Sequence, residues 1–194
     1  MDLLLRRRAM FPQLLPGRRL PSGYTEVSFL ESRGNANVVT NVQGECEVHL
    51  TAQCLSPTST SQLLVHFASS SGGWAGQNGS LWATGPSNRT TIASTQRADI
   101  EIQFVLPTMD MIVNGEHCQR SVTGNPFAGG RLTLFGMDSF WFVGKIFGDV
   151  VCLKNGVEVF RGVPCISPNN VAGYYDLITN QFFAPGRGTL YPGL

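Results

Sequence analysis

A chain of 194 residues, 42% hydrophobic and only 14% charged, can build one sizeable core, and two cores would leave each half small. Its 22 glycines and 11 prolines, against two lysines, favour short strands and many turns over long helices. No segment approaches the roughly 18–20 apolar residues of a membrane-spanning helix, and the leucines at 3–5 are too few for a signal peptide, so we expect neither membrane insertion nor Sec export.

The first 22 residues carry a charge of their own. The net charge of the chain is +1, but residues 1–22 contain five arginines and one aspartate, which leaves the remainder mildly acidic. Pro12, Pro16 and Pro21 each remove a backbone donor and disfavour helix at the preceding residue. The sequence therefore predicts an extended basic arm over residues 1–22 and one domain over residues 23–194. A disordered tail or a misassigned start remains the alternative.

The apolar residues of the arm favour docking on another protein. An arm that only contacts phosphates has little use for leucines or Phe11, so we prefer docking on a neighbouring subunit over binding of nucleic acid. The residues expected to dock are Leu3, Leu4, Leu5, Arg6, Arg7, Arg8, Phe11, Arg18 and Arg19.

From Tyr24 the hydrophobic pattern has a period of two, which predicts β-strands. A first strand runs to Gly34, with Val27 and Phe29 on one face and Leu30 on the other. A second strand is expected at 37–42. A third, at 45–55, should bury one face made of Cys46, Val48, Leu50, Ala52 and Cys54.

Later segments continue the pattern. Strands are predicted at 62–68, 97–106, 131–135 and 140–147, and Trp74 and Trp82 flank a predicted loop at 76–80. The pairs Asn114-Gly115 and Asn155-Gly156 predict tight hairpins, because a type I′ turn needs positive φ at both central residues. About a dozen short strands indicate an all-β fold, an antiparallel two-sheet β-sandwich of jelly-roll type.

The five cysteines fit the same picture. They are odd in number, and their spacing matches no zinc site. Small buried thiols behave as hydrophobic residues in a protein made in the cytoplasm. We expect reduced core residues at Cys46, Cys54, Cys118, Cys152 and Cys165.

Both ends of the domain resemble a known family. Residues 21–32, PSGYTEVSFLES, are similar to the opening of the concanavalin-like, laminin-G-like (LamG) jelly rolls common in structural proteins of tailed phages and prophages. Residues 144–147, the 155–156 hairpin, 173–177 and 182–189 resemble the ending of that family. The resemblance implies that the first and last strands lie side by side. Residues 35–41 depart from the family pattern, because the Tyr and Asp that the family has in this strand are missing from this sequence.

Catalysis and metal binding find little support in the residues. Asp99 and Glu101 alternate as the acids of some concanavalin-like glycosidases do, but Gln103 stands where a third acid would help. His49, His66 and His117 have no motif around them, and no Asp and Asn cluster has calcium-ligand spacing. We expect no enzyme activity, no cofactor and no metal.

Binding is the remaining class, and the loop aromatics are the candidate site. Aromatic faces suit the apolar side of a sugar ring, so Trp74, Asn78 and Trp82 are the candidate glycan contacts. The alternative is that Trp82 and Trp141 are core residues.

The function expected from the resemblance is that of a phage virion protein: a capsid decoration, head fibre or tail-associated component, assembled in the host cytoplasm. Its arm would anchor it to capsid, portal or tail subunits, and it would form a homo-oligomer. The alternative is a lectin-like module that recognises a bacterial surface glycan.

Overall fold

The structure is a computed structural model that describes eleven ranges of the chain: residues 19–44, 46–55, 62–67, 73–77, 80–84, 89–94, 99–105, 108–113, 116–121, 130–137 and 140–194. For residues 54, 62–63, 66–67 and 137, and for those described between 73 and 121, it describes the backbone alone. Every regular element in these ranges is a β-strand. None of the described residues forms a helix with the length and apolar character to cross a membrane.

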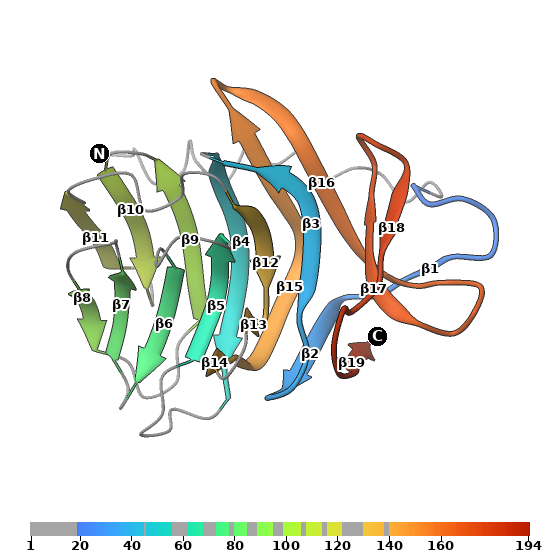
Figure 1. The fold of residues 1–194 in the computed structure, drawn as a ribbon, viewed down its shortest axis with the longest axis horizontal. Coiled ribbons are helices and arrows are strands. Elements are labelled where there is room, and N and C mark those ends of the chain that lie inside the picture. The colour runs from blue at the N-terminus through green and yellow to red at the C-terminus, as the bar shows by residue number, and fades with distance from the viewer. Residues whose placement is uncertain are drawn as a thin grey trace.

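The larger of two sheets has 11 strands (Figure 1). Its strands are β1 (Thr25–Glu26), β2 (Phe29–Arg33), β4 (Glu47–Cys54), β9 (Asp99–Val105), β10 (Thr108–Val113), β11 (Glu116–Ser121), β15 (Val143–Lys154), β16 (Val157–Ile166), β17 (Ala172–Asp176), β18 (Gln181–Phe183) and β19 (Leu190–Gly193). One path through the sheet runs β11-β10-β9-β4-β15-β16-β17-β18, while β2 pairs with β15 and β19, and β1 pairs with β16.

The smaller sheet has 8 strands. They are β3 (Val38–Gln43), β5 (Gln62–Phe67), β6 (Gly73–Gln77), β7 (Ser80–Thr84), β8 (Arg89–Ser94), β12 (Arg131–Leu134), β13 (Gly136–Met137) and β14 (Phe140–Trp141). Pairing is antiparallel except at Trp141 and Leu63, where β14 meets β5 in parallel. The loop predicted at 76–80 is wrong in extent, because β6 reaches Gln77 and β7 begins at Ser80.

One hydrophobic cluster joins the two sheets. Leu30, Leu50 and Ile146 come from the larger sheet, Val38 and Leu132 come from the smaller one, and all belong to the same buried cluster. Alternating side chains of the two sheets therefore face each other, which is the arrangement of a β-sandwich. The predicted burial of the inner face of β4 is confirmed at Cys46, Val48, Leu50 and Ala52, while the side chain of Cys54 lies outside the described residues.

The last strand lies beside part of the predicted first strand, as the resemblance implied: β19 pairs with β2 (Figure 1). Tyr191 thereby lies opposite Glu31. The Asn155-Gly156 hairpin is confirmed too: both residues have positive φ, 51° and 76°, between β15 and β16. Asn114 and Gly115 lie outside the described residues, but Val113 and Glu116 on either side of them are paired.

The expected face of Phe29 is wrong. Val27 and Leu30 are both buried in the main cluster, and Phe29 points away from it. The strict alternation fails because the strand is interrupted between β1 and β2, at Val27 and Ser28. The next inward residue of β2 is Ser32, which is also buried.

A second buried cluster lies on β16 and β17. Leu20 packs with Val163, Cys165 and Tyr175, none of which belongs to the main cluster. Tyr24 adds an edge contact to Tyr175, with ring centroids 5.0 Å apart. Segment 19–24 therefore covers part of the larger sheet on the face away from the main core. The described, packed chain begins at Arg19, four residues before the predicted domain boundary at 23.

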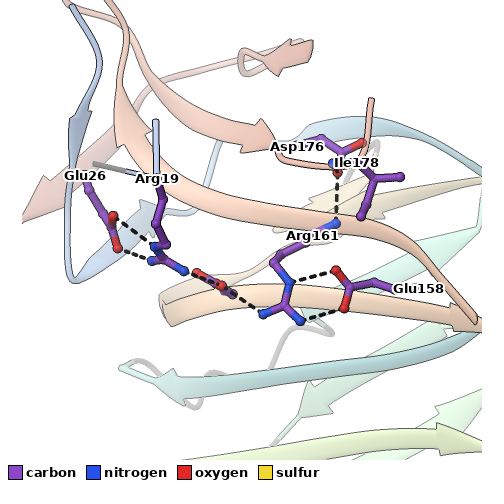
Figure 2. Close-up of polar contacts among 7 residues, drawn as sticks. Arg19, Glu26, Glu158, Arg161, Asp176 and Ile178 are labelled. Atoms are coloured by element: carbon purple, nitrogen blue, oxygen red, sulfur yellow. Dashed lines mark hydrogen bonds and ion pairs between the residues drawn. The ribbon is translucent and has the colours of Figure 1, made fainter. Parts of the chain in front are cut away.

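Asp176 organises the turn after β17. Its side chain is fully buried, and one carboxylate oxygen accepts bonds from the backbone N–H groups of Arg161 and Ile178 (Figure 2). The other oxygen accepts bonds from the backbone N–H and the hydroxyl of Thr179. A buried carboxylate is tolerated when donors satisfy it in this way. The Tyr-Tyr-Asp-Leu part of the family-like ending thus has a structural explanation in this fold.

We expect Asp176→Ala to lower the free energy of unfolding by roughly 1–3 kcal/mol, because it leaves buried N–H groups without an acceptor. Asp176→Asn should cost less, since it keeps one acceptor oxygen. Urea unfolding measures the difference. Gln181→Ala, an exposed change on β18, is the control and should change stability little. Equal effects of Asp176→Ala and Gln181→Ala would contradict this account of the turn.

Stability should also fall at alkaline pH through Cys165. Burial raises the pKa of this thiol from 9.0 to about 12. Below pH 9 the thiol is protonated in both states, whereas between pH 9 and 12 the unfolded chain loses the proton and the native state keeps it. The free energy of unfolding must then fall as the pH rises. Burial also raises the pKa values of Cys152 and Tyr174, which act in the same direction.

Urea unfolding of wild type and Cys165→Ala between pH 8 and 11 isolates this effect. The variant should be less stable at pH 8 but should lose stability less steeply above pH 9. Val163→Ala removes buried apolar atoms from the same cluster without removing an ionisable group, so its curve should stay parallel to that of wild type. A Cys165→Ala curve that is also parallel would refute the assignment.

Candidate functional site

The outer face of β2, β15 and β19 brings aromatic and basic side chains together. Leu30 on β2 and Ile146 on β15 point into the main core, so the residues that alternate with them point outward. Tyr191 lies opposite Glu31 and shares this outer face. We call this surface the aromatic–basic patch; it consists of Phe29, Glu31, Arg33, Lys145, Phe147 and Tyr191.

Strand register arranges the patch in two rows across the sheet. Tyr191, Glu31, Lys145 and Gln53 follow one another on β19, β2, β15 and β4. Phe29, Phe147 and Thr51 form the neighbouring row on β2, β15 and β4. Because adjacent strands are about 4.8 Å apart, the first row is roughly 14 Å long.

Each cation of the patch lies against an aromatic ring. The guanidinium carbon of Arg33 is 3.8 Å from the ring centroid of Tyr191, and Nζ of Lys145 is 4.3 Å from that of Phe29. These are cation–π contacts, in which the ring face attracts the positive charge. The Phe29 and Phe147 rings are 5.4 Å apart, so the aromatic surface continues onto β15.

Glu31 lies between the two cations. Its carboxylate accepts a bond of 2.9 Å from Nε of Arg33 and lies 3.9 Å from Nζ of Lys145. The bond to Glu31 raises the pKa of Arg33, which therefore stays charged. With two positive groups and one negative group, the patch has a net positive charge.

A glycine makes room for the Phe29 ring. Gly193 lies opposite Phe29 in the β2–β19 pair, and a β-carbon at position 193 would overlap the ring. The absence of a side chain there lets the ring lie over the backbone of β19. Phe29 therefore packs across the strand edge without entering the core.

A second group of charges joins the N-terminal segment and β1 to β15 and β16 (Figure 2). Arg19 pairs with Glu26 and, at 2.7 Å, with Asp149, while Arg161 pairs with Glu158 at 2.6 Å and reaches Asp149 at 3.4 Å. Bonds to Glu26 and Glu158 raise the pKa values of Arg19 and Arg161, respectively. The ions satisfy one another, and this network attaches the N-terminal segment to the sheet.

The network bears on the expected docking arm. Arg19 was predicted to contact a partner, but in the structure its guanidinium binds Glu26 and Asp149 of its own chain. The remaining docking residues, Leu3 to Arg18, lie outside the described residues. Arm docking therefore stays a prediction.

The structure describes only the backbone at the predicted glycan contacts. Trp74 on β6 pairs with Ala83, and Trp82 on β7 pairs with Ala75, so the two positions are brought close together on neighbouring strands. Asn78 lies outside the described residues. Trp141, considered as a core residue, is half-buried on β14.

The acids considered for catalysis lie on β9, where Asp99 pairs with Gln53 and Glu101 with Thr51. Their side chains are outside the description, so catalysis is not tested. Within the described ranges, no group of three or more His, Cys, Asp or Glu side chains is placed to hold a metal ion.

Sequence reasoning missed the aromatic–basic patch. The signal was present in residues 29–33, where Phe29, Glu31 and Arg33 alternate with Leu30 and Ser32. Phe29 was expected on the same face as the buried Val27. For this reason Phe29, Glu31 and Arg33 were not recognised as one outward-facing row.

No protein-family model matches the chain, and no curated protein matches it either. Among solved structures, a "putative carbohydrate binding protein" from Bacteroides ovatus is similar, with a TM-score of 0.53 and 9% sequence identity over 87% of this chain. The chain spans 61% of the length of that structure. At this identity the likeness concerns the fold alone, and it agrees with the all-β sandwich expected from the sequence.

Proposed function

We propose that the chain is a carbohydrate-binding module whose ligand lies on the aromatic–basic patch. The observation that carries the proposal is the pair of cross-strand rows that place Tyr191, Phe29 and Phe147 beside charged and polar side chains on one outer sheet face. Sugar rings have apolar C–H faces and polar hydroxyl edges. Aromatic rings suit the former, and hydrogen-bonding side chains suit the latter.

Two further features support the proposal. Thr51 and Gln53 extend the rows onto β4 and supply a hydroxyl and an amide for sugar hydroxyls. The similar structure from Bacteroides ovatus is itself described as a carbohydrate-binding protein, which favours a binding module over the virion component expected first. A strand-built surface also needs little ordering when ligand binds, because the sheet holds its backbone rigid.

The other expectations stay predictions. The sequence alone supports membership of the LamG-like phage family, a place in a virion, partner subunits, homo-oligomers and the absence of catalysis. Trp74 on β6, Asn78, and Trp82 on β7 remain a rival location for the glycan.

A glycan array probed with the full chain tests the function and its location together. Tyr191→Ala and Phe147→Ala should each weaken binding by roughly tenfold or more, because central aromatic contacts dominate such interfaces. Phe140→Ala is the matched control, since Phe140 is an aromatic residue on β14 that is 48% exposed, in the other sheet. It should leave binding unchanged.

Trp74→Ala belongs in the same assay. Loss of binding in Trp74→Ala, with Tyr191→Ala unaffected, would locate the glycan at Trp74 on β6 and contradict the aromatic–basic patch as its site. An array on which the wild-type chain binds no glycan would refute the function itself.

A further inference from the structure

We propose that the patch selects acidic polysaccharides, with Arg33 binding their carboxylate or sulfate groups. This inference rests on the proposed function and specifies its ligand. The observation behind it is that the aromatic rings of the patch already carry cations: Arg33 lies over Tyr191 and Lys145 lies over Phe29.

Covered rings change what can stack on them. A neutral sugar must displace Arg33 to lie flat on that face of Tyr191, and the displaced guanidinium loses both its ring contact and its place beside Glu31. An acidic sugar can bind with these contacts in place, because its anionic group meets a cation that is already positioned. Charge complementarity therefore favours the acidic ligand.

Arg33 has the geometry for such a ligand. Its side chain is 61% exposed, and within the described part of the chain only its Nε is hydrogen-bonded, to Glu31. The two terminal nitrogens of the guanidinium are left for an anion, and this planar fork matches a carboxylate or sulfate oxygen pair. Stacking on Tyr191 holds the plane of the fork in place.

Lys145 supplies the second charge. It lies beside the same Glu31, at 3.9 Å, and so close to Arg33 across the β2–β15 pair. Glu31 cancels only one of the two positive charges. Because Glu31 lies beside both cations, a polymer with repeated anionic groups can reach Arg33 and Lys145 together.

The experiment uses two matched pairs of polymers, titrated into the full chain by calorimetry at low salt and again at higher salt. Polygalacturonate is compared with its methyl-esterified form, and dextran sulfate with dextran. We expect at least tenfold tighter binding to the acidic member of one or both pairs, with affinity falling as salt is raised. The first pair reports a carboxylate ligand and the second a sulfate ligand.

Variants locate the interaction. Arg33→Gln should lose the preference for the acidic member, and Arg33→Lys should recover it only in part, because lysine keeps the charge but not the fork. Arg131→Gln is the control: Arg131 is an exposed arginine on β12 of the smaller sheet, and its loss should leave binding unchanged. Thermal melting of each variant shows that it is folded.

The outcomes separate the two proposals. Equal binding of acidic and neutral polymers, sensitive to Tyr191→Ala, would overturn the acidic preference and keep the carbohydrate-binding function. Equal losses in Arg33→Gln and Arg131→Gln would indicate general charge attraction and overturn the role of Arg33. Binding of neither polymer pair would overturn the acidic preference, and the glycan array then decides the function separately.

Discussion

The long strand β15 is the element on which both faces of the larger sheet depend. It pairs with β4 along one edge and with β2 and then β16 along the other. From Phe147 to Val151 it advances four residues while β4 advances two, from Thr51 to His49. Because the surplus is even, side chains keep their faces across the irregularity. A surplus of one residue would have placed either the core residues or the patch residues on the wrong face.

The outer face that β15 supports is divided into a covered part and an open part. Over β16 and β17, the apolar side chains are covered by Leu20 and Tyr24 of the chain's own N-terminal segment, which the Arg19 ion pairs hold in place. Over β2 and β19, cations lie on the faces of the aromatic rings. The apolar surface is thus covered differently in the two parts: by apolar side chains over β16 and β17, and by basic side chains over β2 and β19.

Much of the fold could be predicted from the sequence, because period-two alternation and Asn-Gly turns are local signals. The inner face of β4 and the Asn155-Gly156 hairpin are examples. The face of Phe29 could not be predicted in the same way, because the interruption at residues 27–28 depends on backbone bonds to distant residues: Val27 donates to Pro164 and Ser28 to Gly193. The sequence does not reveal that β15 continues across Gly148 either, because pairing with strands distant in the sequence holds the two parts of β15 together. The position of the patch follows from the pairing of β2 with β19, which residue spacing alone does not reveal.

The contacts within the patch are difficult to explain by stability alone. Ion pairs and cation–π contacts between partly exposed groups add little to the free energy of unfolding, since water and salt screen them. A large aromatic residue that is exposed singly needs no explanation, but the exposed Tyr191 shares its sheet face with the packed rings of Phe29 and Phe147 and with two cations. Ordering two long basic side chains over these rings costs conformational entropy that folding gains little from. This ordering favours ligand binding, because the entropy of fixing the two cations is then lost on folding and not when the ligand binds. A ligand that takes advantage of this arrangement is one that brings negative charge to these cations.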